Sequence, residues 1–239
     1  ADPDFREWIK TEKRAQKDVL NYLIGACAMD DLLGNLITEG NLSTPRKSTA
    51  EFGWIVALPE HVRTNDYFHV KYVPDRREKP TDKDEREGNL GQAIFHRPAS
   101  SGVYAMVCHL ETCRIGYNDV TQAYVIDQQR REARYRALLE SLLYAFIEPG
   151  GAMRNTQLPH IVEVSGAVTV SYGVLPAPAL SPLSPTYVDE LQGVADQLNA
   201  LHGDGAVAVY PFENMAGLTE IMRGLIESTT PYTLTTVTA

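Results

Sequence analysis

The chain has 239 residues, of which 44% are hydrophobic and 22% charged, and its formal net charge is −9. This composition is that of a globular protein with room for a sizeable core, and it excludes a disordered or fibrous chain. No apolar run is long enough to cross a bilayer, and the charged start "ADPDFREWIKTEKRAQ" has no apolar core, so we expect a cytoplasmic protein without a membrane partner.

The charges are unevenly distributed along the chain. Residues 155–239 contain one basic residue, Arg223, against eight acidic ones, so the other 21 of the 22 Lys and Arg residues precede them. Cations crowded into one part can build a positive surface despite a negative total. The distribution therefore permits a polyanionic partner. Three cysteines without a C-x-x-C spacing fit a reduced compartment.

In chain order, apolar spacing predicts helices over 5–15 and from 19 through "AMDDLLG". The loop "GNLSTPRKST" (40–49) precedes the alternating run "AEFGWIVAL" (50–58), which predicts a buried strand that includes Trp54. A second strand is predicted over 67–73. The segment "PDRREKPTDKDEREGN" (74–89) has no apolar residues and indicates a charged surface insertion.

The second half alternates strands and helices. "GQAIFHRP" (91–98) and "SGVYAMVCHLETC" (101–113) read as two strands joined by the turn "RPASSG", and the latter as a central strand. An apolar stripe predicts a long helix over 128–146. A β run (161–170), a Pro-rich linker (175–185), a helix (187–201), a "GDG" turn, a short strand and a last helix (217–226) follow. The fold class predicted is α+β, an antiparallel sheet backed by helices.

Catalytic motifs are not evident. We find no nucleophile elbow, zinc-protease, P-loop or dinucleotide signature. Asp30 and Asp31 are interpreted as surface carboxylates, with capping or metal binding as the alternative. "CHLETC" (108–113) is interpreted as containing a core cysteine and not a zinc site, because zinc sites usually need paired knuckles. We therefore expect no catalytic residue, no metal and no cofactor.

Three loops share a composition of cations, hydroxyls, amides and glycine, which with free backbone N–H groups can hold phosphate oxygens without reading sequence. Each could also be a solvated turn. The four arginines of "RREARYR" (130–136) oppose the dipole at the start of a helix and fit a partner or a solvated face equally. The candidate residues of the three loops are Ser43, Arg46, Lys47 and Ser48 of "NLSTPRKST", Arg97 of "HRPASSG", and Met153, Arg154, Asn155 and Gln157 of "GGAMRNTQ".

Several ordered blocks, "GNLSTPRKSTAEFGWIVALPE", "YFHVKYVPDR", "IFHRPASSGVYAMV", "RYRALLESLLYAF" and "EPGGAMRNTQLPH", closely resemble the backbone subunit of type I CRISPR Cascade complexes, in the branch called the CRISPR-associated autoregulator, DevR family. The resemblance implies an RRM-like (ferredoxin-like) palm with finger and thumb insertions over 1–175. The Pro-rich linker and an αβα extension (176–239) would pack on that palm. Copies would line up as a helical filament along one guide RNA (crRNA) with other Cascade subunits, and present it to a target nucleic acid, expected to be DNA.

The resemblance also implies site roles. It assigns backbone contact to Arg46 and Lys47 with the hydroxyls of their loop, then to Arg97, Arg154, Asn155 and Gln157, and an RNA-facing apolar contact to Met153. The insertion that holds Arg77, Lys79 and Lys83 would belong to a finger or thumb. Two departures stand out. There is no RNP-type aromatic strand, and family members carry a strand and a helix ahead of the region where this chain starts.

Three functions compete at this stage. A non-enzymatic guide-RNA backbone is the expected one. A metal-dependent ribonuclease of the type III kind, with Asp30 or Asp31 as its acidic residue, would cleave paired target RNA. A stand-alone autoregulator would bind promoter DNA without guide RNA, although no helix-turn-helix signature is visible.

Overall fold

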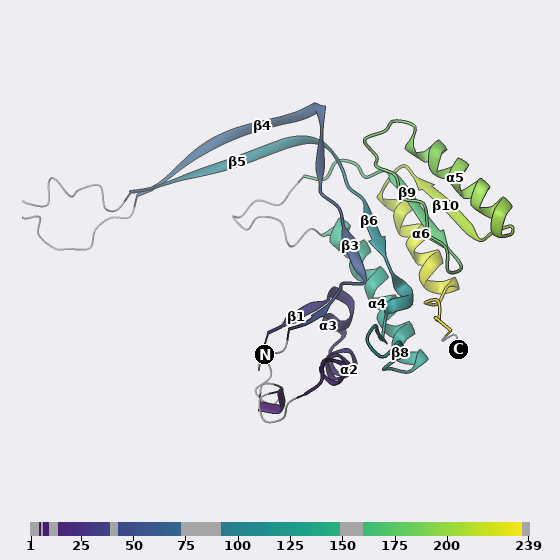
Figure 1. Ribbon diagram of the computed structural model, residues 1–239. Helices are drawn as coiled ribbons and strands as arrows, with labels where there is room; N and C mark the ends of the chain where they lie inside the picture. Colours follow the sequence, from purple (N-terminus) through teal and green to yellow (C-terminus); the bar gives the residue numbers. More distant parts are fainter. Residues whose placement is uncertain are drawn as a thin grey trace, which may run out of the picture. The chain divides into compact units, whose positions relative to one another are not determined.

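The structure is a computed structural model that describes residues 5, 7–9, 14–38, 43–72, 92–148 and 160–235, and the side chains of these except for 67–72 and 92–98. The chain divides into two compact units (Figure 1). The first unit comprises Ala1–Gly53 and Val107–Ala239, and the second comprises Trp54–Met106. The predicted insertion at 74–89 lies outside the described residues.

The first unit begins with two helices, α2 (Gln16–Ala26) and α3 (Ala28–Leu33). The buried face of α2 carries Val19, Leu20, Leu23 and Ile24, as its apolar spacing predicts. The prediction of one uninterrupted helix is wrong at Cys27, whose φ of −127° and ψ of 117° are extended. The break ends α2 and makes α3 a separate element.

Short antiparallel pairs follow. Strand β1 (Asn35–Ile37) pairs with β2 (Thr44–Arg46), and β3 (Ala50–Phe52) pairs with β6 (Cys108–Leu110). After the 3-10 turn η2 (Thr112–Arg114), β7 (Tyr117–Asn118) pairs with β8 (Ala123–Tyr124). The α+β class is confirmed. Every sheet among the described residues has two strands, so the ferredoxin-like arrangement stays a prediction.

The main core lies between two helices. The long helix α4 (Gln128–Ile147) begins where the Asp127 carboxylate accepts a hydrogen bond from the Arg130 N–H. Most of its predicted apolar stripe is buried and packs with α6 (Met215–Ser228), while Leu142 and Phe146 are partly buried. A fully buried side chain of this size contributes about 1.5–3 kcal/mol relative to an exposed one. The shared core contains Tyr135, Leu138, Leu139, Leu143, Leu218, Met222 and Leu225.

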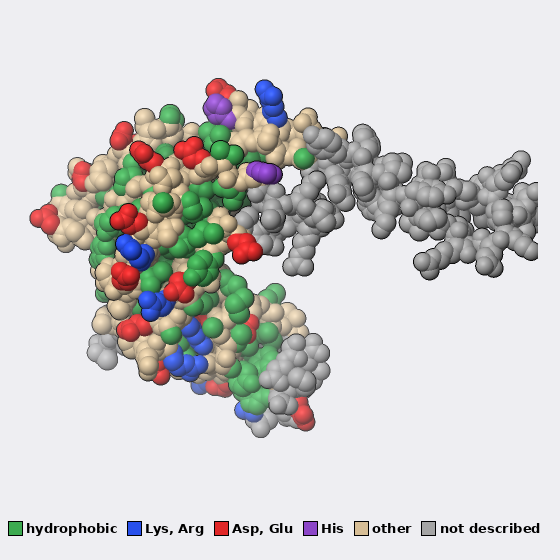
Figure 2. Space-filling model, turned by 180° about the vertical axis from the view of Figure 1, so that it is seen from behind, with side chains coloured by type: hydrophobic (Ala, Val, Ile, Leu, Met, Phe, Trp, Pro, Cys, Tyr) green, Lys and Arg blue, Asp and Glu red, His purple; other side chains and the backbone are tan. Residues whose placement is uncertain are grey.

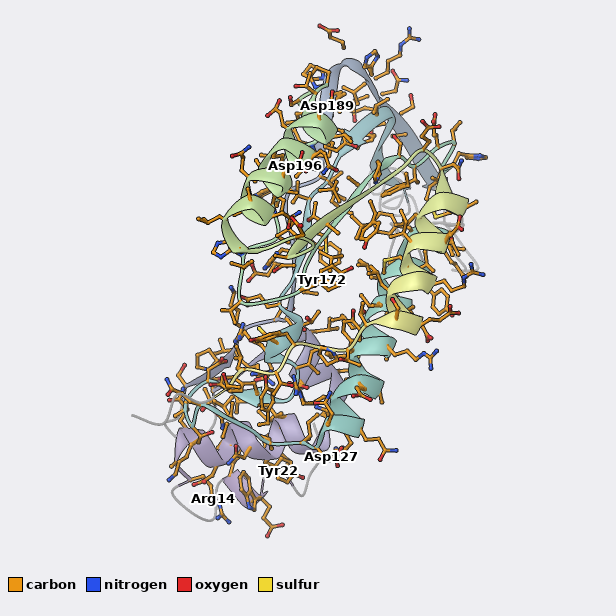
Figure 3. All side chains as sticks on the ribbon, turned by 90° about the vertical axis from the view of Figure 1, so that its right-hand side faces the viewer. Arg14, Tyr22, Asp127, Tyr172, Asp189 and Asp196 are labelled. Atoms are coloured by element: carbon orange, nitrogen blue, oxygen red, sulfur yellow. The ribbon has the colours of Figure 1, made fainter. Side chains whose placement is uncertain are left out.

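In the C-terminal part, one pair of antiparallel strands lies between helices. Strand β9 (Gly166–Ser171) pairs antiparallel with β10 (Val207–Phe212), and the face with Val168 and Phe212 packs on the α4–α6 core. Helix α5 (Tyr187–His202) is tied to the strands because the Asn199 amide bonds both the N–H and the C=O of Val207. Figure 3 shows α5 and α6 on opposite sides of β9 and β10.

The second unit is one long antiparallel hairpin of β4 (Val56–Tyr72) and β5 (Gln92–Ala105), with an irregularity between Ala57 and Val62. The predicted turn at 97–102 is wrong, because these residues pair with β4 inside β5. A long partner ladder outweighs the local turn preference of "RPASSG". The predicted burial of Trp54 is also wrong: Trp54 lies between β3 and β4, with 91% of its surface exposed.

Candidate nucleic-acid interface

Arg46, the leading candidate from the sequence, lies inside the first unit. Its side chain is only 1% exposed, and Nη2 donates to Asp31 Oδ1 (2.5 Å) and to the Arg114 carbonyl (2.9 Å). Nη1 donates to the Tyr117 carbonyl (2.7 Å) and Nε to the Asp31 carbonyl (3.4 Å). Burial lowers the pKa of Arg46, and the Asp31 carboxylate opposes that shift. Because Nε, Nη1 and Nη2 all donate within the chain, the guanidinium of Arg46 is not available for a bidentate contact with a phosphate in this conformation.

Asp31 is the other half of the same network, and its interpretation as a surface carboxylate is wrong. Its side chain is fully buried and accepts hydrogen bonds from Arg46, from Arg134 Nη1 (2.7 Å) and from the Gly116 N–H (2.9 Å). A buried carboxylate needs such partners because it has lost its water. Both carboxylate oxygens accept hydrogen bonds, so Asp31 is not available to coordinate a catalytic metal while these contacts remain.

Lys47 follows Arg46 and points outward, with 58% of its side chain exposed. Its Nζ lies 2.6 Å from Glu51 Oε1 and 3.8 Å from Glu111 Oε2. The hydrogen bond to Glu51 is the main cause that raises the pKa of Lys47, and it lowers the pKa of Glu51 in return. Exposed pairs of this kind are weak and screened by salt. Lys47 can therefore exchange a carboxylate for a phosphate.

The other sequence candidates are placed unequally. The Ser48 hydroxyl accepts from the Ala50 N–H (3.0 Å) and lies 2.6 Å from the Ala50 carbonyl, so it stabilises the turn into β3. Ser43 is exposed beside β2. Arg97 lies on β5 opposite Tyr67, and its side chain is outside the described set. Met153, Arg154, Asn155 and Gln157 lie outside the described residues.

The arginines at the start of α4 have partners within the chain. Arg130 donates to the Gly25 carbonyl, and Arg136 lies 3.4 Å from Glu140. Arg134 is buried against Asp31. Arg131 donates to the carbonyls of Ile115 and Tyr232, and its guanidinium lies 3.8 Å from the centre of the Tyr124 ring. Interior contacts thus account for Arg131 and Arg134 without a polyanion, whereas the contacts of Arg130 and Arg136 lie at the surface.

Arg131 and Arg134 could have been found from the sequence. Arg131, Arg134, Tyr135 and Leu138 follow the i, i+3, i+4, i+7 spacing of the buried stripe, so the pattern already placed both arginines on the inner face. On the side of the molecule seen in Figure 2, Lys and Arg side chains are interspersed with Asp and Glu. Although most Lys and Arg residues lie in the first part of the sequence, they do not form a uniformly positive surface on this side of the molecule.

The base of the hairpin is a second candidate surface. Besides Trp54, the exposed residues there include Tyr104, Val103, Ile55 and Val56. The Tyr104 hydroxyl donates to Ser100 Oγ (2.7 Å), which fixes the direction of its ring edge. We call Trp54, Ile55, Val56, Val103 and Tyr104 the hairpin base. Sequence reasoning missed it because alternation suggested a buried strand, although Gly53 and Pro59 bracket the run.

Polar groups lie along the same hairpin. Arg63 pairs across the strands with Ser101, and both are exposed together with His61. Glu60 and Asp66 on β4 are exposed too and offset the charge of Arg63. Exposed aromatic rings with few net charges suit contact with base faces better than long-range attraction of phosphate.

Other kinds of site find less support. Among the described residues, no three His, Cys, Asp or Glu side chains gather in a way that could hold a metal ion. Burial raises the pKa of the Cys108 thiol to about 11, which leaves it a poor nucleophile and ligand at neutral pH. In the part of the chain that the structure describes, no helix has the length and apolarity to cross a membrane.

Comparison with known proteins identifies the family of this chain. No curated protein matches the chain. A family model described as CRISPR-associated negative auto-regulator DevR/Csa2 matches residues 4–192, which include α2 to β9, the whole hairpin and the start of α5. The match covers more than half of the sequence. The chain belongs to the CRISPR-associated DevR/Csa2 family.

Proposed function

We propose that this chain is the guide-RNA-binding backbone subunit of a CRISPR interference complex. Copies of it line up along the crRNA as a helical filament, with other Cascade subunits, and present the spacer for pairing with a target nucleic acid, most simply DNA. The proposal includes no catalytic residue and no cofactor, and a cytoplasmic location. Family membership is the observation that carries it.

The hairpin supports this function. At about 3.3 Å per residue, the 17 residues of β4 amount to roughly 55 Å of strand. A two-stranded hairpin is marginally stable alone in water and needs a hydrophobic face packed on something else. The hairpin base exposes apolar side chains on both faces of the pair, with Val56 and Val103 on one face and Tyr104 on the other. A strand of RNA and the neighbouring copies that hold it are the partners that the family implies.

The chemistry of the exposed residues fits single-stranded RNA. Trp54 and Tyr104 offer ring faces on which bases can stack without regard to sequence, and Arg63 and Lys47 offer cations. A backbone subunit needs this tolerance, because pairing by the guide selects the target. Lys47 is retained as a phosphate contact, while Arg46 supports its loop from within.

The first unit supplies the palm in this proposal. Strands β3 and β6 are backed by α4, since Ala50 and Leu110 pack with its buried stripe. This strand pair and helix would form part of an RRM-like palm over 1–175, completed by strands that the described pairs do not include. The part after the Pro-rich linker packs on it through α4 and α6.

The competing functions have less support. A ribonuclease that used Asp31 would first have to break its contacts with Arg46, Arg134 and Gly116. A stand-alone regulator agrees with the words of the family description, but we find no described element that favours duplex DNA. Discrete binding to promoter DNA in the absence of RNA would favour the regulator.

The test uses the small number of tryptophans. The chain has two, and Trp8→Phe leaves Trp54 as the only indole. Trp8 stacks on Phe5 and Tyr22, a role that phenylalanine can keep. Single-stranded crRNA added to this variant should quench Trp54 fluorescence. Trp54→Ala should then weaken RNA binding about tenfold or more, since stacking on one base contributes about 1–3 kcal/mol.

Tyr144→Ala is the matched control, because Tyr144 is an exposed aromatic residue on α4. It should leave the RNA affinity unchanged. If the full-length protein binds no crRNA, the proposed function is wrong. If it binds crRNA with Trp54 neither quenched nor required, the hairpin base is not the contact surface.

A further inference from the structure

Helix α5 carries an apolar stripe that the sheet only half covers. Tyr187, Leu191, Val194, Leu198 and Leu201 are spaced by four, three, four and three residues, the spacing of a helix–helix seam. Leu191 is buried, whereas Val194 is 42% and Leu201 74% exposed. A straight helix drifts relative to this repeat, so the sheet buries one side of the stripe and leaves the other uncovered.

The surroundings of the stripe are acidic. Between residues 160 and 235 all eight acidic side chains are exposed, and Arg223 is the one Lys or Arg in that range. Three of the eight, Asp189, Glu190 and Asp196, lie on α5 itself, two of them labelled in Figure 3. Glu190 also accepts from the Thr186 hydroxyl (2.6 Å), which anchors the helix start. The field at this surface repels phosphate and attracts cations.

We infer that the outer side of α5 is a docking surface for a protein partner, specifically an amphipathic helix whose apolar stripe is flanked by Lys and Arg. The apolar spacing supplies the seam, and Glu190, one helical turn before Val194, supplies charge complementarity together with the negative charge of residues 160–235. Most of the seam, from Val194 onward, lies beyond the residues that the family model matches, which end at 192. The surface is thus a feature of this chain's C-terminal part.

RNA is a poor occupant for this surface. Its phosphates would meet Glu190 beside the exposed side of the stripe, and α5 has no Lys or Arg to offset that charge or those of Asp189 and Asp196. A cationic helix would bury the exposed surfaces of Val194 and Leu201. Its charges would also reduce the repulsion among the carboxylates of this acidic surface. The inference is independent of the guide-RNA proposal and assigns RNA and protein partners to different surfaces.

The test uses two designed helical peptides, both with leucines at heptad spacing, one flanked by lysines and the other by glutamates. The full chain should bind the lysine peptide, and more weakly as salt rises, whereas the glutamate peptide should not bind. Leu201→Ser and Val194→Ser should each weaken binding of the lysine peptide about tenfold. Leu36→Ser is the control, since Leu36 is 62% exposed on β1, and it should change nothing.

Each other result overturns the inference. No binding of the lysine peptide, equal binding of both peptides, or equal binding by Leu201→Ser and wild type removes the docking surface. Displacement of the peptide by single-stranded RNA assigns the surface to RNA. The affinity of Leu201→Ser for crRNA, measured in parallel, should equal that of the wild type, so loss of the docking surface and loss of the guide-RNA function are distinguishable.

Discussion

Replacement of Arg46 by alanine separates a structural role from an RNA contact. Arg46→Ala removes the guanidinium that bonds Asp31 and the carbonyls of Arg114 and Tyr117. Asp31 stays buried with Arg134 and Gly116, and the carbonyls of Asp31, Arg114 and Tyr117 lose this donor. The side chain is 1% exposed, so water cannot replace the lost contacts without opening the structure.

The expected cost is large. Breaking a buried ion pair by removal of one partner costs about 3–5 kcal/mol, and the retained Arg134 contact favours the lower end. For a domain of 150–250 residues, 1 kcal/mol shifts Tm by about 2–4 °C. We therefore expect Arg46→Ala to lower Tm by roughly 6–12 °C. Arg46→Lys should rescue little, because an ammonium cannot reproduce the fork.

Thermal unfolding followed by circular dichroism measures this shift, and crRNA binding well below Tm measures the other role. Lys47→Ala is the control, because Lys47 is the exposed neighbour of Arg46. The Tm of this variant should equal that of the wild type. Its affinity for crRNA should be weaker and should depend less steeply on the salt concentration. The reasoning fails if Arg46→Ala keeps the wild-type Tm and loses crRNA affinity as Lys47→Ala does. That result would make Arg46 the phosphate contact that the sequence suggested.

Three further predictions follow from buried contacts. Gly34→Ala should lower Tm by several degrees or more, because φ is +73° and a Cβ there would lie only 2.7 Å from the Ser48 nitrogen; a Tm equal to wild type would contradict this geometry. Burial raises the pKa of Cys108 to about 11, so its thiol should react with iodoacetamide at pH 8 about a hundredfold more slowly than a peptide thiol. The thiol ionises at a lower pH in the unfolded chain than in the folded one. The free energy of unfolding should therefore fall as the pH rises from about 9 to 11. Arg131→Met should speed hydrogen exchange at 232–234, because Arg131 donates to the Tyr232 carbonyl; unchanged exchange there would show that the tail is held by other contacts, and Arg136→Met serves as the exposed control.

The sequence allowed correct prediction of the elements whose structure depends on residues close together in the chain. The stripe of α4, the helix α5, the "GDG" turn and the helix α6 were all predicted within a few residues, because apolar spacing, glycines and caps act over short distances. The strand predicted at 161–170 is observed later, as β9 (Gly166–Ser171). The α+β class followed from the order of these elements.

The candidate site was predicted less well, because its chemistry depends on long-range pairs. Arg46 reads as a loop cation next to a proline, and its partner Asp31 lies 15 residues away, with Arg134 a further 88 residues beyond Arg46. No local pattern marks that triad. The continuous strand β5 likewise requires a partner, β4, across a segment of the sequence that shows no periodicity.

The most direct test of the guide-RNA assignment is the mass and ultraviolet absorbance ratio of the protein produced together with crRNA, before and after ribonuclease. The account predicts a large particle with a nucleic-acid-rich absorbance ratio that falls to single copies when the RNA is digested. A nucleic-acid-free monomer, obtained from the full-length protein with crRNA supplied, would contradict it.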